Sequence, residues 1–232
     1  MTISRLLKFC RYENPTQLIF VAGPNGAGKS TFSKDLSPAG AFIFDPDKEQ
    51  AAIALKYPNY PPESIGHAFQ QYFQDCIELV IKKKMDFVIE TNFRDHLLMD
   101  IAERFKSYGY ETNMIYLVLQ SIPESMARVA ARVKAGGHYI DDASILYNYN
   151  EGLKNLEYFA GRFDNLEIID ATGDYHKLRS VMSIQKQQLI YLSDKLPKNA
   201  ALIINQIAGR YGNISEKRDN DEERGRDYTI GR

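Results

Sequence analysis

Cysteine is scarce in this chain of 232 residues, and a long hydrophobic run is missing altogether. The two cysteines, Cys10 and Cys76, lie far apart and have no CxxC or Cys/His partner, which argues against a disulfide framework and a zinc site. No stretch approaches the roughly 18 apolar residues of a membrane span, and the opening MTISRLLKFCRYENP has too short an apolar run for a signal peptide. We therefore expect a cytoplasmic protein without membrane association.

An excess of positive charge is also missing. Lys and Arg number 29 against 30 for Asp and Glu, so no general positive field attracts nucleic acid or an anionic membrane, and any anion site must be local. With 44% hydrophobic and 25% charged residues, the composition is that of a globular protein and excludes disordered, collagen-like and mucin-like chains.

Short apolar runs alternate with segments of helical periodicity, a pattern typical of an α/β protein with a mostly parallel sheet covered by helices. Ser121 and Glu124 have the spacing of a capping box at the start of one helix. Strands are predicted at 18–22, 41–44, 87–89, 114–119 and 166–169, with helices from Lys29 onward and at 63–84, 97–108, 121–133 and 143–160. Ligands of such sheets bind beyond the carboxyl ends of the strands.

Three parts of the chain are predicted. Residues 1–175 form the main domain, with a lid around 128–148, and residues 176–214 form a helical C-terminal extension packed on the same domain. Residues 215–232 are almost entirely polar and mixed in charge, so we expect a flexible tail there.

The strongest motif follows the first predicted strand and precedes a helix. It reads GPNGAGKST, satisfies GxxxxGK(S/T), and consists of Gly23, Pro24, Asn25, Gly26, Ala27, Gly28, Lys29, Ser30 and Thr31. Its glycines let backbone amides turn around a phosphate, Lys29 supplies a cation for the outer phosphates, and the Ser30 hydroxyl is placed to bind Mg²⁺. A coincidental glycine-rich turn is the alternative, but the strand and helix on either side favour a three-layer P-loop NTPase or kinase fold that binds ATP.

Polar residues follow two other predicted strands. The second strand leads into Asp45 and Asp47, and we favour Asp47 as the base that accepts the proton of an attacking hydroxyl, the alternative being a turn or helix cap. The third strand leads into Glu90, Thr91, Asn92 and Arg94, which could hold a polar acceptor or serve structure alone. Glu90 could instead help to position Mg²⁺.

A candidate lid begins on the helix that starts at Ser121. Arg128 and Arg132 are four residues apart and share one helix face, and a flexible Gly136-Gly137-His138 segment follows them. An arginine that closes over the transferring phosphate would stabilise its charge and exclude water, whereas the alternative is a solvated basic face. His138 is a weaker candidate for a ligand contact. A Walker B pair and a GTPase base-reading motif are both missing, which favours a compact kinase.

Four segments in this order, GPNGAGKST, FDPDKE, FVIETNFRD and RVAARVKAGGHYIDDASILYNYNEGLKNL, resemble those of the zeta toxin family of P-loop kinases. The resemblance covers residues 18–173. It implies transfer of the ATP γ-phosphate to a sugar hydroxyl of uridine diphosphate N-acetylglucosamine or a similar nucleotide sugar, with Mg²⁺ as cofactor and an antitoxin protein as partner.

The resemblance also implies roles for individual residues. Lys29 matches the P-loop lysine, Ser30 the Mg²⁺-side hydroxyl, and Asp47 the catalytic aspartate. Glu90 and Asn92, with Arg94 close by, match the acceptor-contact segment, and Arg132 matches a lid arginine that contacts phosphate.

The chain departs from the family pattern in the helix after GGH. Asn148 stands before Tyr149 where many relatives have an arginine, and Asp141 stands where proline is common. Arg128 is the candidate substitute for the missing arginine. Two alternatives to the nucleotide-sugar kinase remain, a kinase for another small acceptor such as a nucleoside, nucleotide or antibiotic, and a nucleotide-binding interaction protein with reduced catalysis.

Overall fold

One β-sheet organises the protein in the computed structural model, which describes residues 15–173, 177–211 and 227–229. The described strands are β1 (Gln17–Ala22), β2 (Phe42–Phe44), β3 (Phe87–Thr91), β4 (Glu111–Val118), β5 (Asn165–Asp170), β6 (Lys177–Gln185), β7 (Gln188–Leu192) and β8 (Asp227–Thr229). The described helices are α1 (Lys29–Leu36), α2 (Pro46–Lys56), α3 (Pro62–Lys83), α4 (Leu98–Ser107), α5 (Ile122–Lys134), α6 (Asp142–Phe159) and α7 (Ala201–Gly209), with a short 3₁₀ turn at Ala160–Arg162.

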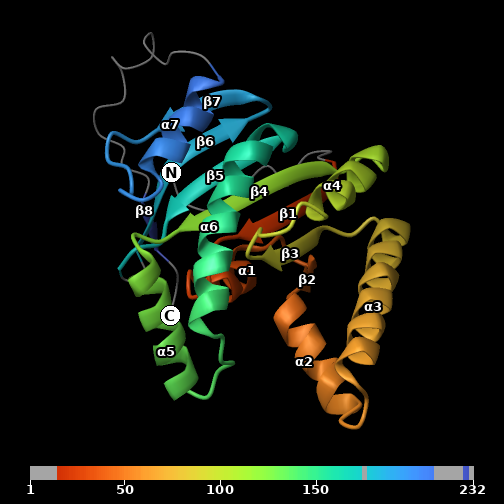
Figure 1. The fold of residues 1–232 in the computed structure, drawn as a ribbon. Helices are drawn as coiled ribbons and strands as arrows, with labels where there is room; N and C mark the ends of the chain where they lie inside the picture. Colours follow the sequence, from red (N-terminus) through yellow and green to blue (C-terminus); the bar gives the residue numbers. More distant parts are fainter. Residues whose placement is uncertain (1–14, 174–176, 212–226, 230–232) are drawn as a thin grey trace.

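The sheet has the strand order β2-β3-β1-β4-β5-β6-β7, and β8 pairs with β6. Strands β1 to β5 are parallel to one another, which confirms the mostly parallel sheet expected from the alternating pattern. All of β1 is buried because its sequence QLIFVA places apolar side chains on both faces of the sheet. The P-loop therefore begins at the end of a central strand (Figure 1).

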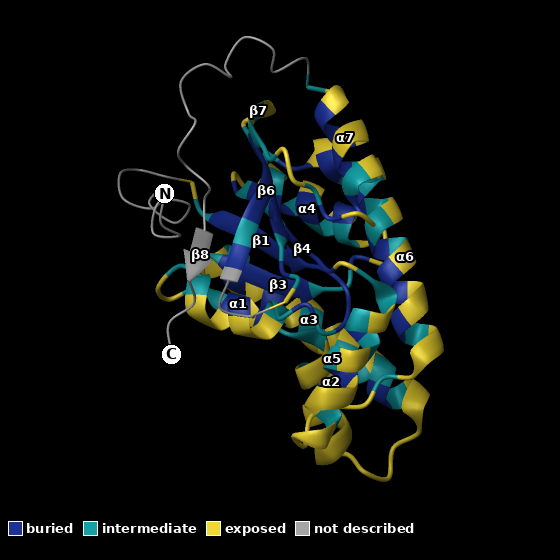
Figure 2. Ribbon diagram, turned by 90° about the vertical axis from the view of Figure 1, so that its left-hand side faces the viewer, coloured by how far each residue is buried: buried dark blue, intermediate teal, exposed yellow. Residues whose placement is uncertain are grey.

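Helices cover both faces of the sheet. The larger apolar cluster packs Phe20 and Tyr116 of the sheet against α3, α4, α6 and α7, and the smaller one packs Val21 and Leu117 against Phe32 of α1. Figure 2 shows the strands as the buried centre, whereas exposed residues gather on α2 and on the outer sides of α5 and α6. The three-layer α/β architecture is thus confirmed.

The expectation of a helical segment from 176 onward is wrong for its first half. Residues 177–192 form the antiparallel strands β6 and β7, and β6 pairs with β5 along the whole of that strand. Lys186 and Gln187 form a two-residue turn with φ values of 47° and 62°, the twist that suits a tight hairpin. Among the described residues of this region, only α7 is helical, and Asp227–Thr229 of the predicted tail pair with β6 as β8.

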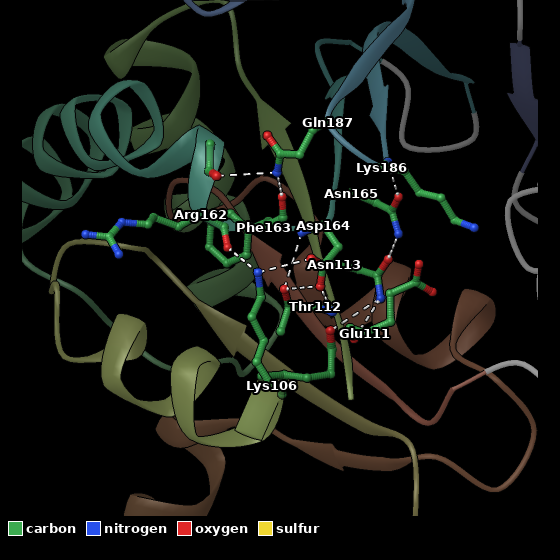
Figure 3. Close-up of polar contacts among 12 residues, drawn as sticks. Lys106, Glu111, Thr112, Asn113, Arg162, Phe163, Asp164, Asn165, Lys186 and Gln187 are labelled. Carbon is green, nitrogen blue, oxygen red and sulfur yellow. Dashed lines mark hydrogen bonds and ion pairs between the residues drawn. The ribbon is translucent and has the colours of Figure 1, made fainter. Parts of the chain in front are cut away.

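Side-chain contacts join the strands at the amino-terminal edge of the sheet (Figure 3). Asp164 accepts hydrogen bonds from the Thr112 backbone amide and hydroxyl, both at 2.8 Å, and an ion pair from Lys106 at 3.1 Å. Although burial alone raises the pKa of Asp164, these donors lower it below its ordinary value. Asn165 continues the network by donating to Asn113 Oδ1 at 2.7 Å. These contacts hold β4 and β5 together at this edge of the sheet.

Two pairs of helices project beyond the opposite, carboxyl-terminal edge of the sheet (Figure 1). One pair is α2 and α3, and the other is α5 and α6, which the segment 135–141 connects. Helix α2 has no buried residue and was not among the predicted helices. Within the described residues, no helix is both long and apolar enough to cross a membrane.

Candidate active site

The P-loop adopts a conformation that depends on two of its glycines. Gly23 has φ 141°, and a Cβ atom at this position would lie 2.4 Å from the Leu117 carbonyl oxygen on β4. Gly26 has φ 78°, and its Cβ would lie 2.8 Å from Cβ of Arg128. The loop is thus wound tightly against β4 and α5. Its Ala27 amide donates to the Pro24 carbonyl at 3.2 Å, a turn of the kind that lets the other amides of such a loop surround an anion.

Lys29 begins α1 and turns back over the loop. Its ammonium donates hydrogen bonds to the carbonyls of Gly23 at 2.9 Å and Pro24 at 3.1 Å, and to Asn92 Oδ1 at 2.8 Å. Removal from water lowers the pKa of Lys29 to about 8, although the negative charges of Asp47, Glu90 and Asp45 act in the opposite direction. A bound phosphate would place a negative charge next to this ammonium.

Two carboxylates meet at Ser30. Its hydroxyl donates to Glu90 Oε2 at 2.6 Å and lies 3.3 Å from Asp45 Oδ2. Burial raises the pKa of Glu90, an effect that the Ser30 hydrogen bond reduces and the charge of Asp45 reinforces. A hydroxyl and carboxylates are oxygen ligands of the kind that Mg²⁺ prefers. Among the described residues, no group of three or more His, Cys, Asp or Glu side chains is arranged to hold a metal ion.

Asp45 and Asp47 take different places at the start of α2. Asp45 is the N-cap, accepts from the Lys48 amide at 3.4 Å, and pairs with the Lys48 ammonium at 2.7 Å. Asp47 lies in the first turn, is exposed, and makes no hydrogen bond within the described part of the chain. The sequence allows either aspartate of the DPD segment to cap the helix. In the structure Asp45 is the cap, and the carboxylate of Asp47 is accessible.

The segment after β3 is a tight turn. The Thr91 hydroxyl accepts from the Phe93 amide at 2.8 Å, and Phe93 is held at φ 55° although its side chain is fully buried. Asn92 faces Lys29, whereas Arg94 is exposed and donates to Asn148 Oδ1 at 3.3 Å. The turn thus carries polar groups toward the P-loop and toward α6.

Helix α5 fixes the P-loop from one side. The Ser125 hydroxyl donates to the Asn25 carbonyl at 2.6 Å, and Arg128 donates to the Gly26 carbonyl at 3.4 Å. Arg128 also pairs with Glu124 at 2.7 Å and donates to the carbonyls of residues 171 and 173 after β5. In this arrangement Arg128 connects α5, the P-loop and the end of β5. The capping bond from the Glu124 amide to the Ser121 hydroxyl, at 3.2 Å, confirms the predicted start of α5.

Arg132 lies one turn further along α5 and is exposed. It donates to the His138 carbonyl at 2.9 Å and thereby connects the helix to the glycine segment that follows it. Its positive charge is near enough to Lys29 to lower the pKa of that ammonium. Arg132 therefore belongs to the same electrostatic environment as the P-loop, while the side chain of His138 is exposed at the surface.

The structure brings most of the predicted site residues together around the P-loop. Sequence reasoning did not anticipate the part that α6 takes. Asn148 is buried and donates to Asn25 Oδ1 at 2.9 Å while it accepts from Arg94. Asn155 donates to the Phe93 carbonyl at 2.8 Å. The spacing of Asn148, Gly152 and Asn155 on one helix face was the available signal.

The P-loop follows the central parallel strand β1, Glu90 lies near the end of the adjacent β3, and Asp45 follows β2 on the far side of β3. This arrangement is that of a P-loop kinase. The sequence comparison then gives the family. Residues 5–180 match the zeta toxin family, and the chain belongs to that family.

Several known proteins are similar to this chain. A protein of Haemophilus influenzae is 27% identical over 131 residues, which are 56% of this chain and 91% of that protein. A structure from the PezAT chromosomal toxin-antitoxin system of Streptococcus pneumoniae is similar with a TM-score of 0.55 and 15% identity, covering 90% of this chain and 94% of the other. A complex of AvrRxo1-ORF1 and AvrRxo1-ORF2 with ATP gives a TM-score of 0.60 and 13% identity, covering 90% and 80%. At these identities the structures show a shared fold.

Proposed function

We propose that this protein transfers the γ-phosphate of ATP to a hydroxyl group of a nucleotide sugar such as uridine diphosphate N-acetylglucosamine. One observation carries the proposal. Lys29 of the P-loop donates to Asn92 Oδ1 at 2.8 Å, and the next residue, Ser30, lies 2.6 Å from Glu90 Oε2 and 3.3 Å from Asp45 Oδ2, so cation, hydroxyl and carboxylates meet at one place. The Lys29 ammonium, which burial removes from water, also lies within the fields of Asp47, the candidate base, and Arg132, the lid arginine. Phosphoryl transfer needs these charges in one place because catalysis rests on positioning and on stabilisation of phosphate charge.

Each residue of the P-loop cluster has a role in this proposal. Residues 23–31 hold the ATP phosphates, Lys29 neutralises the outer ones, and Ser30, with Glu90 and Asp45 behind it, holds Mg²⁺ and its waters. Bound there, Mg²⁺ neutralises charge on the phosphates. Asp47 takes the proton of the acceptor hydroxyl, the acceptor oxygen forms a bond to the γ-phosphorus, and the bond from that phosphorus to the β–γ bridging oxygen breaks to release ADP.

The remaining residues act on the acceptor and on the lid. Thr91 at the end of β3 and Asn92 and Arg94 just after it contact the acceptor, together with His138 from the segment after α5. Arg132 moves with the lid, residues 128–148, and stabilises the migrating phosphoryl group. Arg128 contributes from the ATP side, where it already supports the P-loop backbone.

Two lines of support bear on substrate and partner. The resemblance of the sequence segments to zeta toxins supports a nucleotide sugar as acceptor. The similar Streptococcus pneumoniae protein comes from a toxin-antitoxin system, and the similar AvrRxo1 complex was obtained with ATP. We accordingly propose ATP as donor and an antitoxin protein as partner of this chain.

Mass spectrometry of the reaction products tests the proposal directly. Purified protein is incubated with Mg²⁺, ATP and uridine diphosphate N-acetylglucosamine, and the Lys29→Ala variant serves as control. A phosphate added to the nucleotide sugar by the unmutated protein alone is the expected result. ATP binding without transfer to this or any other small acceptor would contradict the kinase and favour a nucleotide-binding interaction protein.

Asp47→Asn separates the base from the carboxylate next to it. Because this substitution removes the proton acceptor and leaves the P-loop intact, kcat should fall roughly 10²- to 10⁴-fold while the Kd for ATP stays unchanged. Steady-state kinetics and calorimetric ATP titration measure the two quantities. Unchanged kcat would assign the base elsewhere, with Asp45 as the next candidate.

A further inference from the structure

Helix α6 presents one face to both halves of the proposed active site. Asn148, Gly152 and Asn155 are four and three residues apart, so they share a stripe on the helix. Asn148 contacts Asn25 of the P-loop and Arg94 of the turn after β3, whereas Asn155 contacts the backbone of that turn.

The turn that this face meets is strained. Phe93 occupies the left-handed region at φ 55°, a conformation that is unfavourable for a bulky side chain. Such a conformation persists only where the surroundings fix it. The ring supplies part of that fixation because it is buried against Phe159 and Phe163. Backbone contacts must supply the rest.

Two residues of α6 supply those backbone contacts. Asn155 Nδ2 donates to the Phe93 carbonyl at 2.8 Å. Gly152 lets the helix approach the preceding peptide, since a Cβ there would lie 2.6 Å from the Asn92 carbonyl oxygen and 2.7 Å from the Tyr116 hydroxyl oxygen. The helix therefore contacts consecutive peptides of the turn, and any side chain at 152 would push them apart.

The conformation of Phe93 sets the directions of the two neighbouring side chains, Asn92 and Arg94. Asn92 reaches Lys29 at 2.8 Å, and Arg94 reaches Asn148 at 3.3 Å. If the Phe93 peptide relaxed to negative φ, both side chains would leave these directions. The orientation of the acceptor-side groups thus depends on α6, which itself holds no carboxylate or cation at these three positions.

We propose that Gly152 and Asn155 are positioning residues, which hold the 91–94 turn in its strained conformation so that Asn92 and Arg94 are aligned on the acceptor. This inference rests on the proposed function, and it adds residues that act through the turn without touching either substrate. It assigns to α6 the alignment of the acceptor with the ATP site.

Asn155→Asp tests the inference with the smallest change. The variant keeps the size of the side chain but replaces the donor with a carboxylate that repels the Phe93 carbonyl. Asn150→Asp is the matched control because Asn150 is an exposed residue of the same helix and the charge change is identical. Gly152→Ala serves as a second variant that reaches the same turn by steric means.

Kinetics, ATP titration and hydrogen exchange are measured for each variant. In Asn155→Asp and Gly152→Ala, kcat/KM for uridine diphosphate N-acetylglucosamine should fall about 10- to 100-fold, as misplacement of a reacting group causes, while the Kd for ATP changes less than about threefold. Asn150→Asp should match the unmutated protein. Equal losses in ATP and acceptor binding, or an unchanged kcat/KM, would overturn the inference.

Hydrogen exchange separates this inference from the proposed function. Amide exchange measured by mass spectrometry should accelerate in segment 90–97 of Asn155→Asp and stay slow there in Asn150→Asp. If the unmutated protein phosphorylates no acceptor, the proposed function fails while this exchange result still decides whether α6 holds the turn. Exchange that is unchanged, or that accelerates across the whole chain, would refute the positioning role.

Discussion

At the scale of single residues, Lys29 is a buried cation whose hydrogen-bond acceptors are all uncharged. Its three acceptors are two carbonyls and an amide oxygen, all neutral, so the ammonium is hydrogen-bonded but has no counterion in direct contact. Removal from water therefore outweighs the distant carboxylates, and the pKa falls to about 8. Binding of a phosphate would reverse this balance, so nucleotide binding and stability are coupled through one side chain.

The pH dependence of stability gives this coupling a measurable form. The pKa of Lys29 is 10.5 in its ordinary state and about 8 in the folded protein, so the unfolded chain binds the proton more tightly between these values. The contribution of Lys29 to the free energy of unfolding should therefore rise as pH increases from about 8 toward 10.5 and stay flat below about 8.

Urea unfolding of the protein and of Lys29→Met, carried out without nucleotide between about pH 7 and 10, measures this contribution as the difference between the two. Subtraction cancels the titration of the other lysines and the tyrosines. A difference that does not change with pH would mean that the Lys29 ammonium is well solvated. A difference that falls with pH would mean that the nearby carboxylates outweigh its removal from water.

Residues that belong to a specific motif could be assigned a role from the sequence. Residues whose role depends on their contacts in three dimensions could not. Lys29 and Ser30 could be assigned because GxxxxGK(S/T) between a strand and a helix constrains both backbone and side chains. The division of labour between Asp45 and Asp47 could not, since either aspartate can cap a helix. Asn148 looked like a departure from the family pattern, and its buried contacts to Asn25 and Arg94 became visible only in three dimensions.

At the scale of elements, the β6–β7 hairpin marks where sequence reasoning failed. The turn consists of Lys186 and Gln187, and neither is a residue that usually occupies the left-handed region. No Asn-Gly or Asp-Gly pair indicates a hairpin here, so the local sequence predicts a helix instead. Tertiary pairing with β5 decides the conformation here, and such pairing leaves no local pattern.

Lys186→Gly should stabilise the protein by about 0.5 to 1 kcal/mol, because glycine relieves the left-handed strain at φ 47° and this exposed lysine has no packing to lose. Chemical denaturation measures the free energy of unfolding. Lys83→Gly, which replaces the last residue of α3, is the control and should destabilise by up to about 1 kcal/mol. A destabilised Lys186→Gly protein would show that the turn is not strained in solution.

At the scale of the whole molecule, the apolar core does not divide at the predicted boundary near residue 175. Val181 of β6 and Ile204 of α7 belong to the same buried cluster as Phe20 of β1. Arg179 also pairs with Asp170 across the β5–β6 interface at 2.9 Å. We therefore propose that 177–209 are an integral part of the kinase domain, in keeping with the expected packing of the extension on the main domain.

A shared core predicts a single cooperative unfolding transition. Differential scanning calorimetry should give one peak whose calorimetric and van't Hoff enthalpies agree, because the C-terminal strands cannot separate without exposing the sheet. Addition of ATP and Mg²⁺ should move that peak to higher temperature as a whole. Two resolved peaks, or a peak that only partly responds to nucleotide, would show that the two segments unfold independently.

The position of β6 late in the sequence affects when the chain can fold during synthesis. All residues of the proposed active site, from Gly23 to His138, precede in the sequence the strand that completes the sheet beside β5. A nascent chain that ends before β6 leaves β5 as an unpaired edge strand and a half-covered core, so the kinase cannot reach its native state. We therefore expect a chain truncated before β6 to lack activity, although it carries every residue of the proposed active site.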